Sequence, residues 1–325
     1  MAKRRALITG VNGQDGSYLT ELLLAQDYEV YGVDKYPQPA VLASSCRLEQ
    51  MHVVDLMDPS LLGQVVREVR PDEVFYLAAH HFSSQTDDNR LGRLEPFVNV
   101  NLLAVNSALE AIAEELPASR FFYAASAHIF GRPAVSPQNE ATPFNPETPY
   151  AISKCAGVHL CRYFRQTRGV FTSVGILYNH ESPRRGPSFI TTTLARAAAL
   201  ASSGKTEPLV VKDLDAVVDW GAAQDYVRAM WLMLQQDPPD EYVVASGTGR
   251  TVRDLAHQAF ASAGVSDEGL VRQDPAGRHA ATTPMVGDSE KLRHRTGWRA
   301  EISFEAMVSA MVTEQQRILR QARAR

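Results

Sequence analysis

The sequence predicts an α/β protein built on a doubly wound parallel sheet, with a smaller mixed lobe toward the C-terminus. In the first half, short apolar strands alternate with helical stretches, and a glycine-rich turn joins the first strand to the first helix. The second half is less regular and is punctuated by prolines. We therefore expect residues 1–178 to form one domain. Residues 179–325 should form mainly a second, substrate-binding lobe, with some segments returning to the first domain.

The expected strands are short apolar runs that end at glycine, at a small residue or at a polar residue. They are residues 6–9, 29–33, 51–54, 73–78, 121–125 and 172–177. Apolar residues at helical spacing predict helices between these strands and in the second half. The clearest are residues 61–69, 149–168, 191–202, 222–235, 252–263 and 304–321. Strands that alternate with helices in this way lie parallel and are joined by right-handed crossovers.

Composition and charge exclude several classes of protein. The chain of 325 residues has 33 Lys and Arg against 37 Asp and Glu, a net charge of −4. We therefore expect no broad basic face that binds nucleic acid. No run of about eighteen apolar residues is present, so we expect no membrane-spanning helix. Cys46, Cys155 and Cys161 have no metal-binding spacing, which favours reduced thiols in a cytoplasmic protein without a metal site.

A Gly-x-x-Gly-x-x-Gly turn, formed by Gly10, Gly13 and Gly16, follows the first strand and opens the first helix. One glycine permits the tight turn, another lets the backbone approach a pyrophosphate, and the third lets the helix pack closely on the strand. The helix N-terminus adds free N–H groups and a partial positive charge. The pattern predicts a Rossmann-like domain that binds NAD(P), with Gln14 and Asp15 beside the cofactor.

Asp34 lies at the end of the second strand, where a carboxylate accepts hydrogen bonds from ribose hydroxyls and repels a 2′-phosphate. This favours NAD as the cofactor, while Lys35 weakens the repulsion and keeps NADP possible. Further cofactor-binding candidates stand at the ends of the third and fourth strands. They are Asp55, Leu56 and Ala78.

Tyr150 and Lys154 form a Tyr-x-x-x-Lys pair, which a helix places on one face. We expect the lysine cation to lower the pKa of the tyrosine, so that the phenol serves as an acid or base near neutral pH. Ser126, at the end of the preceding strand, supplies a hydroxyl for the same reacting oxygen. The glycine turn, the serine and the Tyr/Lys pair together predict a dehydrogenase.

The sequence resembles the GDP-mannose 4,6-dehydratases, a group of extended short-chain dehydrogenases/reductases, over nearly its whole length. The resemblance is carried by residues 6–19, 142–150 and 219–234, and most specifically by GILYNHESPRRG at 175–186. It implies oxidation of a nucleotide sugar at C4 by NAD(P), elimination of water across C5 and C6, and return of the hydride to C6. Related members act as C4 epimerases or 4-ketoreductases.

The resemblance also implies how the substrate binds. Asn179, Arg184, Arg185 and Arg278 stand where relatives hold the nucleotide diphosphate of a GDP-linked sugar. Guanidinium groups suit a diphosphate because they stay charged and donate in a planar fork. Relatives pair through helices near Ala104 and Tyr150, so we expect a homodimer or a higher homo-oligomer.

The sequence departs from the family pattern at His128, where the dehydratases carry the glutamate that acts at C5 and at the C6 hydroxyl. Three interpretations are open. The imidazole takes over the acid–base work, the enzyme performs only hydride chemistry, or the histidine is structural. Val218 also replaces an arginine expected near the diphosphate, the segment after Asp34 lacks paired arginines, and His80-His81 replaces the usual residues near the sugar.

Three hypotheses follow, in order of preference. The first is a GDP-mannose 4,6-dehydratase-like enzyme with Tyr150, Lys154, Ser126 and His128 as catalytic residues. The second is a nucleotide-sugar C4 epimerase or 4-ketoreductase without the elimination step. The third is a non-catalytic dinucleotide sensor, which retention of the Tyr/Lys/Ser set disfavours because binding alone needs no acid–base group.

Overall fold

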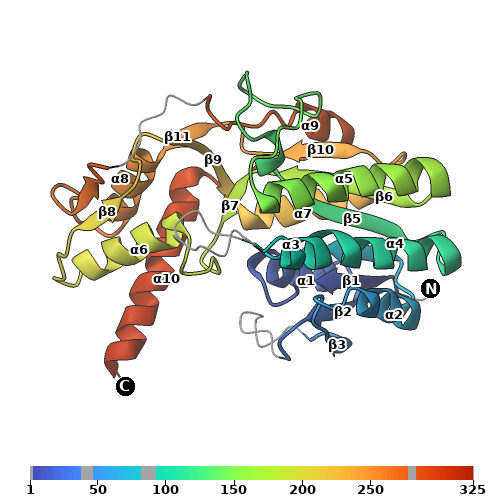
Figure 1. The fold of residues 1–325 in the computed structure, drawn as a ribbon. Helices are drawn as coiled ribbons and strands as arrows, with labels where there is room; N and C mark the ends of the chain where they lie inside the picture. The colour runs from blue at the N-terminus through green and yellow to red at the C-terminus, as the bar shows by residue number, and fades with distance from the viewer. Residues whose placement is uncertain (1–2, 38–46, 82–92, 277–282, 325) are drawn as a thin grey trace.

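The computed structural model describes residues 3–37, 47–81, 93–276 and 283–324. Its main feature is a seven-stranded parallel sheet in the order β10-β6-β5-β4-β1-β2-β3 (Figure 1). The strands are β1 (Arg5–Thr9), β2 (Glu29–Asp34), β3 (Gln50–Val53), β4 (Glu73–Tyr76), β5 (Arg120–Ser126), β6 (Phe171–Leu177) and β10 (Glu241–Val244). The predicted doubly wound sheet is confirmed.

Helices cover both faces of this sheet and bury its apolar side chains in two separate cores. On one face lie α2 (Ser60–Val69), α4 (Ala104–Glu115) and α5 (Pro149–Arg168), and on the other α1 (Gln14–Ala25) and α7 (Ala223–Leu234). Strands buried on both faces read as continuous apolar runs. This is why all four residues of β4 and the last six of β5 are buried.

One apolar stretch, Glu95–Glu115, is long and apolar enough to cross a membrane by length and composition. It forms α3 (Glu95–Val98), the π-helical turn η2 (Asn99–Leu103) and α4. Its apolar residues Val105, Leu109 and Ile112 belong to the core shared with α2 and α5. The stretch is therefore part of the packing of the main domain.

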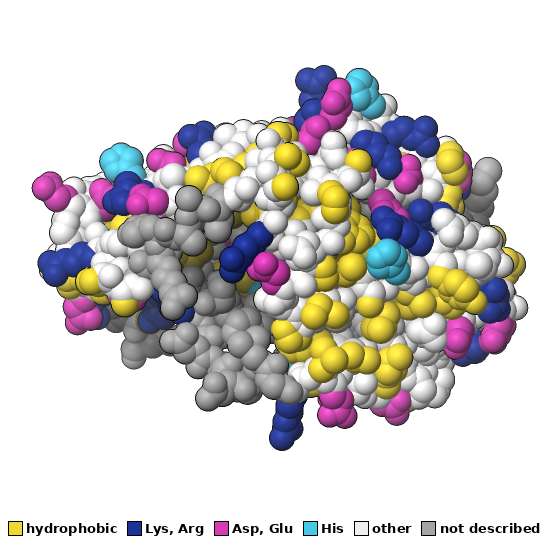
Figure 2. All heavy atoms as spheres, turned by 45° about the horizontal axis from the view of Figure 1, so that its top comes forward, with side chains coloured by type: hydrophobic (Ala, Val, Ile, Leu, Met, Phe, Trp, Pro, Cys, Tyr) yellow, Lys and Arg dark blue, Asp and Glu magenta, His cyan; other side chains and the backbone are white. Residues whose placement is uncertain are grey.

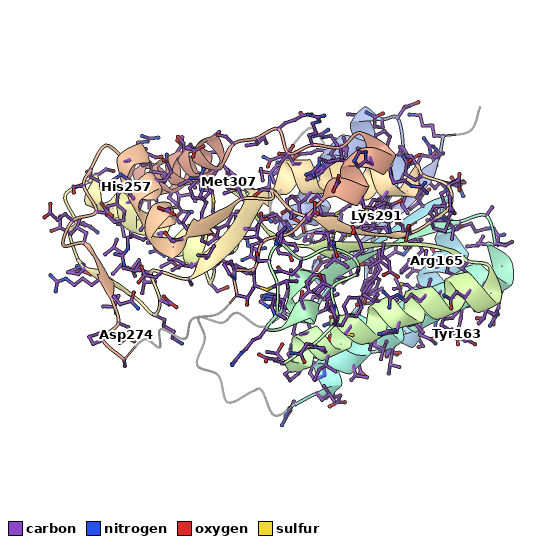
Figure 3. The ribbon with its side chains drawn as sticks, turned by 90° about the horizontal axis from the view of Figure 1, so that it is seen from above. Tyr163, Arg165, His257, Asp274, Lys291 and Met307 are labelled. Atoms are coloured by element: carbon purple, nitrogen blue, oxygen red, sulfur yellow. The ribbon has the colours of Figure 1, made fainter. Side chains whose placement is uncertain are left out.

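The smaller lobe has a mixed three-stranded sheet, a parallel two-stranded sheet and three helices around a third core. Its strands are β7 (Asn179–Glu181), β8 (Leu209–Val211), β9 (Val217–Ala222), β11 (Gly249–Thr251) and β12 (Val271–Gln273), and its helices are α6 (Ile190–Ala201), α8 (Val252–Ser262) and α10 (Phe304–Ala324). Seen from above, this lobe lies beside the main domain, with His257 and Met307 far from Tyr163 on α5 (Figure 3).

The chain crosses between the two bodies more than once. After β9 it returns to the main domain as α7 and β10, which pairs with β6. After β12 it returns again as α9 (Glu290–Thr296), where Leu292 joins the core of α1 and α7. The chain then enters the smaller lobe once more as α10.

The strands and helices expected from the sequence agree with the structure to within a few residues, with one instructive difference. The fourth strand ends at Tyr76 and not at Ala78, because the N–H groups of Leu77 and Ala78 donate to Thr9 Oγ1 (3.1 Å each). This contact turns the chain away from the sheet and toward the cleft that follows.

Candidate active site

A cleft of about 530 Å³ opens at the carboxyl ends of the central strands, with a second cavity of about 360 Å³ adjoining it. Gly10, Asp34 and Ala78 line both. The cleft lies where the strand order reverses between β1 and β4, the position at which open α/β sheets bind ligands.

The glycine turn forms the floor of this cleft. Gly10 has a positive φ of 71° and packs against the backbone of Ala78, so a side chain there would be strained and crowded. A Cβ on Gly16 would lie 2.6 Å from Val11 Cα, which shows how closely α1 approaches the end of β1. Gly13 is the N-cap of α1 and has no side chain to compete for the free N–H groups. The turn therefore fits a dinucleotide diphosphate.

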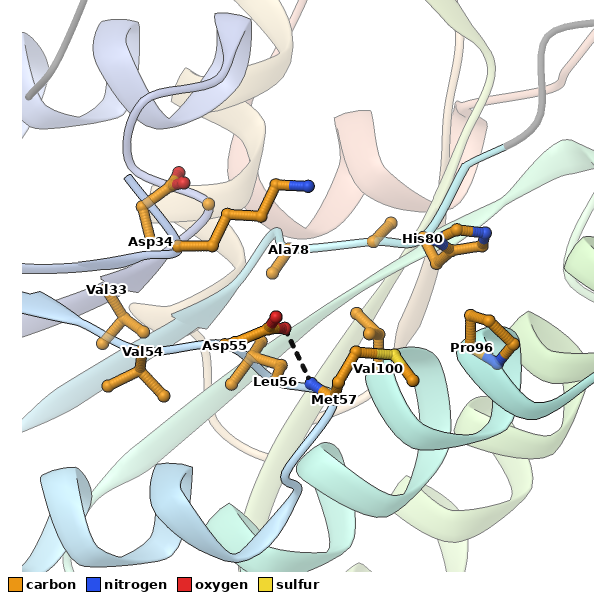
Figure 4. Close-up of a pocket in the computed structure, with 13 residues that line it drawn as sticks. Val33, Asp34, Val54, Asp55, Leu56, Met57, Ala78, His80, Pro96 and Val100 are labelled. Atoms are coloured by element: carbon orange, nitrogen blue, oxygen red, sulfur yellow. Dashed lines mark hydrogen bonds between the residues drawn. The ribbon is translucent and has the colours of Figure 1, made fainter. Parts of the chain in front are cut away.

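The second cavity suits the adenosine half of a dinucleotide (Figure 4). Asp34 accepts a hydrogen bond from the Asn12 N–H (3.2 Å) and faces this cavity. Asp55 also lines it and accepts from the Met57 N–H (3.0 Å), which fixes the turn after β3. Leu56, buried at 7% exposure, supplies an apolar wall. Each of the predicted cofactor-binding residues therefore borders one of the two cavities.

Tyr150 and Lys154 stand in the first turns of α5, whose start is fixed by local sequence. The Thr148 side chain caps the helix by accepting from the Ala151 N–H (3.1 Å), and Pro149 occupies its first position. The four-residue spacing directs both side chains into the cleft, which Ser126 at the end of β5 also lines.

The protonation of this pair differs from the sequence-based expectation. Burial raises the pKa of Tyr150 to about 12, and burial lowers the pKa of Lys154 to about 7. Lys154 Nζ donates to the Ala124 carbonyl oxygen (2.7 Å) and lies 5.9 Å from the centre of the Tyr150 ring. The expectation that Lys154 lowers the pKa of Tyr150 is wrong here, because desolvation outweighs a charge that bonds elsewhere.

Two histidines flank Tyr150 inside the cleft. His81 and His128 both meet the Tyr150 ring edge-on, with ring centres 5.0 and 6.2 Å away. His128 is reached by solvent through the cleft, yet the surrounding protein atoms lower its pKa. Burial, followed by Arg185, lowers the pKa of His81 to about 4. Both rings are therefore neutral near pH 7 and able to accept a proton.

The residues expected to hold the diphosphate are separated by the fold. Asn179 and Arg185 line the cleft. Arg184 turns to α1, where it bonds Ser17 Oγ (3.0 Å) and pairs with Glu21. Its guanidinium carbon lies 3.9 Å from the centre of the Tyr18 ring. Arg278 lies outside the described residues, as does Cys46.

Gln14 and Asp15 direct their side chains to the segment after β6. Gln14 Nε2 donates to the His180 carbonyl oxygen (3.0 Å), and Ser182 Oγ donates to Gln14 Oε1 (2.7 Å). Asp15 pairs with the imidazole of His180, with 2.8 Å between Oδ2 and Nε2. These contacts join the glycine turn to β7.

His81, His180 and Phe189 are among the cleft residues that sequence reasoning missed. In the sequence, His81 stands out only because it departs from the family pattern. Phe189 packs beneath the Arg185 guanidinium, 3.5 Å from ring centre to guanidinium carbon. His180 stood within the most specific motif, GILYNHESPRRG, but nothing local to that motif identifies Asp15 as its partner.

Comparison with known proteins agrees with this geometry. The family model described as GDP-mannose 4,6 dehydratase matches residues 7–311. An Arabidopsis thaliana protein named GDP-mannose 4,6 dehydratase 2 is 37% identical over 332 residues, which cover 96% of this chain and 87% of that protein.

Solved structures with the same fold include RMD from Pseudomonas aeruginosa complexed with NADPH, 27% identical with a TM-score of 0.82. The alignment covers 97% of this chain and 100% of RMD. A UDP-glucose 4-epimerase from Thermus thermophilus, complexed with NAD, is 24% identical with a TM-score of 0.79, and the alignment covers 96% of this chain and 99% of the epimerase. This similarity shows that the chain and the epimerase share a fold.

The resemblance inferred from the sequence is thus confirmed by the match to the family model and to a relative over most of the chain, and by the fold shared with RMD. The chain belongs to the GDP-mannose 4,6-dehydratase family of extended short-chain dehydrogenases/reductases, NAD(P)-dependent enzymes that act on nucleotide sugars.

Proposed function

We propose that this protein oxidises C4 of a GDP-linked hexose and then eliminates water across C5 and C6. One observation carries the proposal: Tyr150, Lys154, Ser126 and His128 line the same cleft as the glycine turn. A cleft that served only to bind a dinucleotide would need no acid–base groups beside it. The set therefore disfavours a sensor.

The floor and the adjoining cavity would hold the cofactor, with Gly10, Gly13 and Gly16 under its diphosphate and Asp34 beside the adenosine ribose. When bound, NAD(P) supplies the hydride acceptor and donor. The Asp34 carboxylate supports NAD over NADP, because it lies where a 2′-phosphate would be repelled. The RMD neighbour, in contrast, was solved with NADPH.

Tyr150 and Ser126 would handle the proton of the C4 hydroxyl. The phenol and the Ser126 hydroxyl line the same cleft, and Ser126 acts to lower the pKa of the phenol, so we assign both to one reacting oxygen. Tyr150 would take the hydroxyl proton during oxidation. The C4 oxygen then stays a ketone, and the later reduction adds the hydride at C6 and a proton at C5, which gives the C6 methyl group. Lys154, whose pKa burial lowers to about 7, donates to the Ala124 carbonyl oxygen, and we assign it a role in orienting the bound cofactor and substrate beside Tyr150.

His128 would perform the elimination. Its neutral imidazole accepts the proton from C5, which the C4 ketone makes acidic, and becomes an imidazolium. The C5–H and C6–O bonds break, a C5–C6 double bond forms, and the imidazolium gives its proton to the leaving hydroxyl, which departs as water. One group thus serves as base and then as acid.

The substrate would extend from this cleft past Arg185, which also lines a neighbouring cavity of about 760 Å³. That cavity carries Arg196, Lys205 and Glu207. We assign the diphosphate to Arg185 and Asn179. Arg184 would act indirectly, since its guanidinium is held by Ser17 and Glu21.

A second candidate is a C4 epimerase or 4-ketoreductase. It is favoured by the absence of a carboxylate at position 128, where the family's elimination residue stands. This reaction needs Tyr150 and Lys154 but no acid–base group at C5.

The two candidates differ in the product formed in deuterated water. The protein with NAD or NADP is incubated with GDP-mannose, and the sugar is analysed by mass and NMR. Deuterium at C5 with a C6 methyl group supports elimination, and a C4 epimer without deuterium at C5 supports the second candidate. His128→Gln should abolish deuterium incorporation while C4 oxidation persists. Full elimination by this variant would remove His128 from the mechanism.

We also infer a homo-oligomer, with a homodimer as the simplest form. Leu103 on η2 and Ile152 and Tyr163 on α5 are large apolar side chains that are 43%, 49% and 52% exposed. Figure 2 shows hydrophobic side chains gathered over the right-hand half of the view, on the side of the main domain. A cytoplasmic location fits the free thiols of Cys155 and Cys161.

A further inference from the structure

A partly buried ion pair joins the first turn of α1 to strand β7. His180 Nε2 lies 2.8 Å from Asp15 Oδ2, and His180 Nδ1 lies 2.7 Å from the Tyr178 carbonyl oxygen. A carboxylate and a carbonyl oxygen both only accept hydrogen bonds. The imidazole can donate to both only when each ring nitrogen carries a hydrogen. The geometry therefore assigns a positive charge to His180.

The groups around the ring support this assignment. Burial lowers the pKa of His180, Asp15 on α1 raises it through its charge and its hydrogen bond, and Arg185, in the loop after β7, lowers it. The pKa nevertheless lies above the usual histidine value, while that of Asp15 lies below its usual value, with His180 as the largest favourable cause. From α7, the Tyr226 ring stacks on the imidazole at 4.5 Å between ring centres.

Other contacts hold the pair in place. Gln14 Nε2 bonds both Asp15 Oδ1 (3.1 Å) and the His180 carbonyl oxygen (3.0 Å). Gly221 on β9 leaves room for Tyr226, since a Cβ there would overlap its ring. The neighbouring carboxylate of Glu181 is engaged by Thr191 Oγ1 (2.8 Å) and Arg185 (3.0 Å). It is therefore not an alternative partner for the imidazole.

The position of this pair bears on cofactor binding. Asp15 is the acidic residue in the first turn of α1, two positions after the Gly13 N-cap, and it lines the cleft. The free N–H groups here attract an anion, but an unneutralised carboxylate beside them would repel a diphosphate. A cation paired to that carboxylate removes the repulsion.

We propose that protonated His180 is a positioning residue for the dinucleotide, which neutralises Asp15 and ties the glycine turn to β7 so that the turn accepts a diphosphate. His180 acts through Asp15. Because Asn179 lies next to it on β7 and faces the same cleft, the pair also links the cofactor floor to the substrate strand. The proposal rests on dinucleotide use and is independent of which sugar reaction follows.

The test measures NAD and NADP dissociation constants by titration, without sugar, between pH 6 and 9.5. The variants are His180→Gln, Asp15→Asn and the double variant. His257→Gln is the matched control, because His257 also faces an aspartate, Asp267 (3.4 Å), but is exposed on α8 in the distant lobe. Thermal unfolding of each variant is recorded in parallel.

His180→Gln should weaken dinucleotide binding about tenfold or more at pH 7, since it leaves the carboxylate unpaired beside the diphosphate. The double variant should return to within about threefold of the parent, because no carboxylate then remains to be neutralised. The parent should lose affinity as the pH rises through the pKa of His180. Asp15→Asn should abolish this pH-dependent loss of affinity. The control His257→Gln should leave it intact.

A merely structural role for His180 predicts a different pattern, in which the double variant is no better than His180→Gln. That pattern, or an unchanged dissociation constant in His180→Gln, would overturn the proposal. If His180→Gln does not fold, the Asp15→Asn variant is sufficient for the test. An Asp15→Asn protein that still loses its full dinucleotide affinity as the pH rises would refute the role assigned to the Asp15–His180 pair. All these readouts are binding constants, so a failed sugar assay leaves them interpretable.

Discussion

Replacing Tyr150 by phenylalanine removes one oxygen from the centre of the cleft and little else. The ring is held edge-on by His81 and His128, at 5.0 and 6.2 Å between centres, and a phenylalanine ring fits the same space. The lost oxygen interacts with the Ser126 hydroxyl, which acts to lower the pKa of the phenol. Losing at most one hydrogen bond lowers the free energy of unfolding by about 0.5–1.5 kcal/mol.

The effect on catalysis should be much larger. General acid–base groups contribute about 10²- to 10⁴-fold to rate, which corresponds to about 3–5 kcal/mol of activation free energy. We expect Tyr150→Phe to slow C4 oxidation by this factor while the dinucleotide dissociation constant stays within about twofold. Single-turnover formation of reduced nicotinamide at saturating nucleotide sugar measures the first quantity, and fluorescence titration measures the second.

The pH dependence provides a separate check. Oxidation needs the phenolate, and the pKa of Tyr150 is raised to about 12, so the rate of oxidation in the parent should rise with pH through the neutral range. The variant should lose this dependence. Tyr163→Phe, on the exposed side of the same helix, is the control. A Tyr150→Phe enzyme that keeps more than about a tenth of the parent rate would refute the assigned role.

Four other substitutions test the cofactor and substrate assignments. Arg185→Ala should raise the KM for the nucleotide sugar about tenfold or more with little change in kcat. Arg184→Ala breaks the ion pair with Glu21 and should instead lower the Tm in thermal unfolding. Equal effects of the two variants on KM would contradict the assignment of the diphosphate to Arg185 and not to Arg184. Asp34→Asn should change the preference between the two cofactors by about tenfold in favour of NADP, measured as the ratio of the NAD and NADP dissociation constants. An unchanged ratio would show that Asp34 does not contact the adenosine ribose. Gly16→Ala should destabilise the fold by about 1–3 kcal/mol in denaturant titration and abolish dinucleotide binding, because its Cβ would lie 2.6 Å from Val11 Cα; normal binding would show that the turn adapts.

Features set by neighbouring residues could be predicted from the sequence. The bounds of α5 follow from the Thr148 cap, Pro149 at the first helical position and Gly169 in the left-handed conformation at its end. The turn Gly10–Gly16 likewise carries its own conformational requirement, and Tyr150 and Lys154 share a face because of helical spacing alone. In these cases the determining interactions span a few residues.

The strands of the second half were harder to predict. β10 has only four residues, and its place at the edge of the large sheet depends on partners far along the chain. Arg162 donates to both carboxylate oxygens of Glu241, which holds β10 against α5. Short segments of this kind carry too little periodicity to be distinguished from loops.

The sequence by itself therefore determined the fold class, the glycine turn and the family, and it placed Tyr150 and Lys154 on one face of a helix. Only the tertiary structure decided which partner each charged group has and which protons it holds. Arg184 and Arg185 are adjacent in the chain, yet one pairs with Glu21 on α1 and the other faces the cleft. Asp15 and His180 are 165 residues apart and meet at 2.8 Å. Pairing and pKa depend on distance and burial in space, and neither is encoded by spacing along the chain.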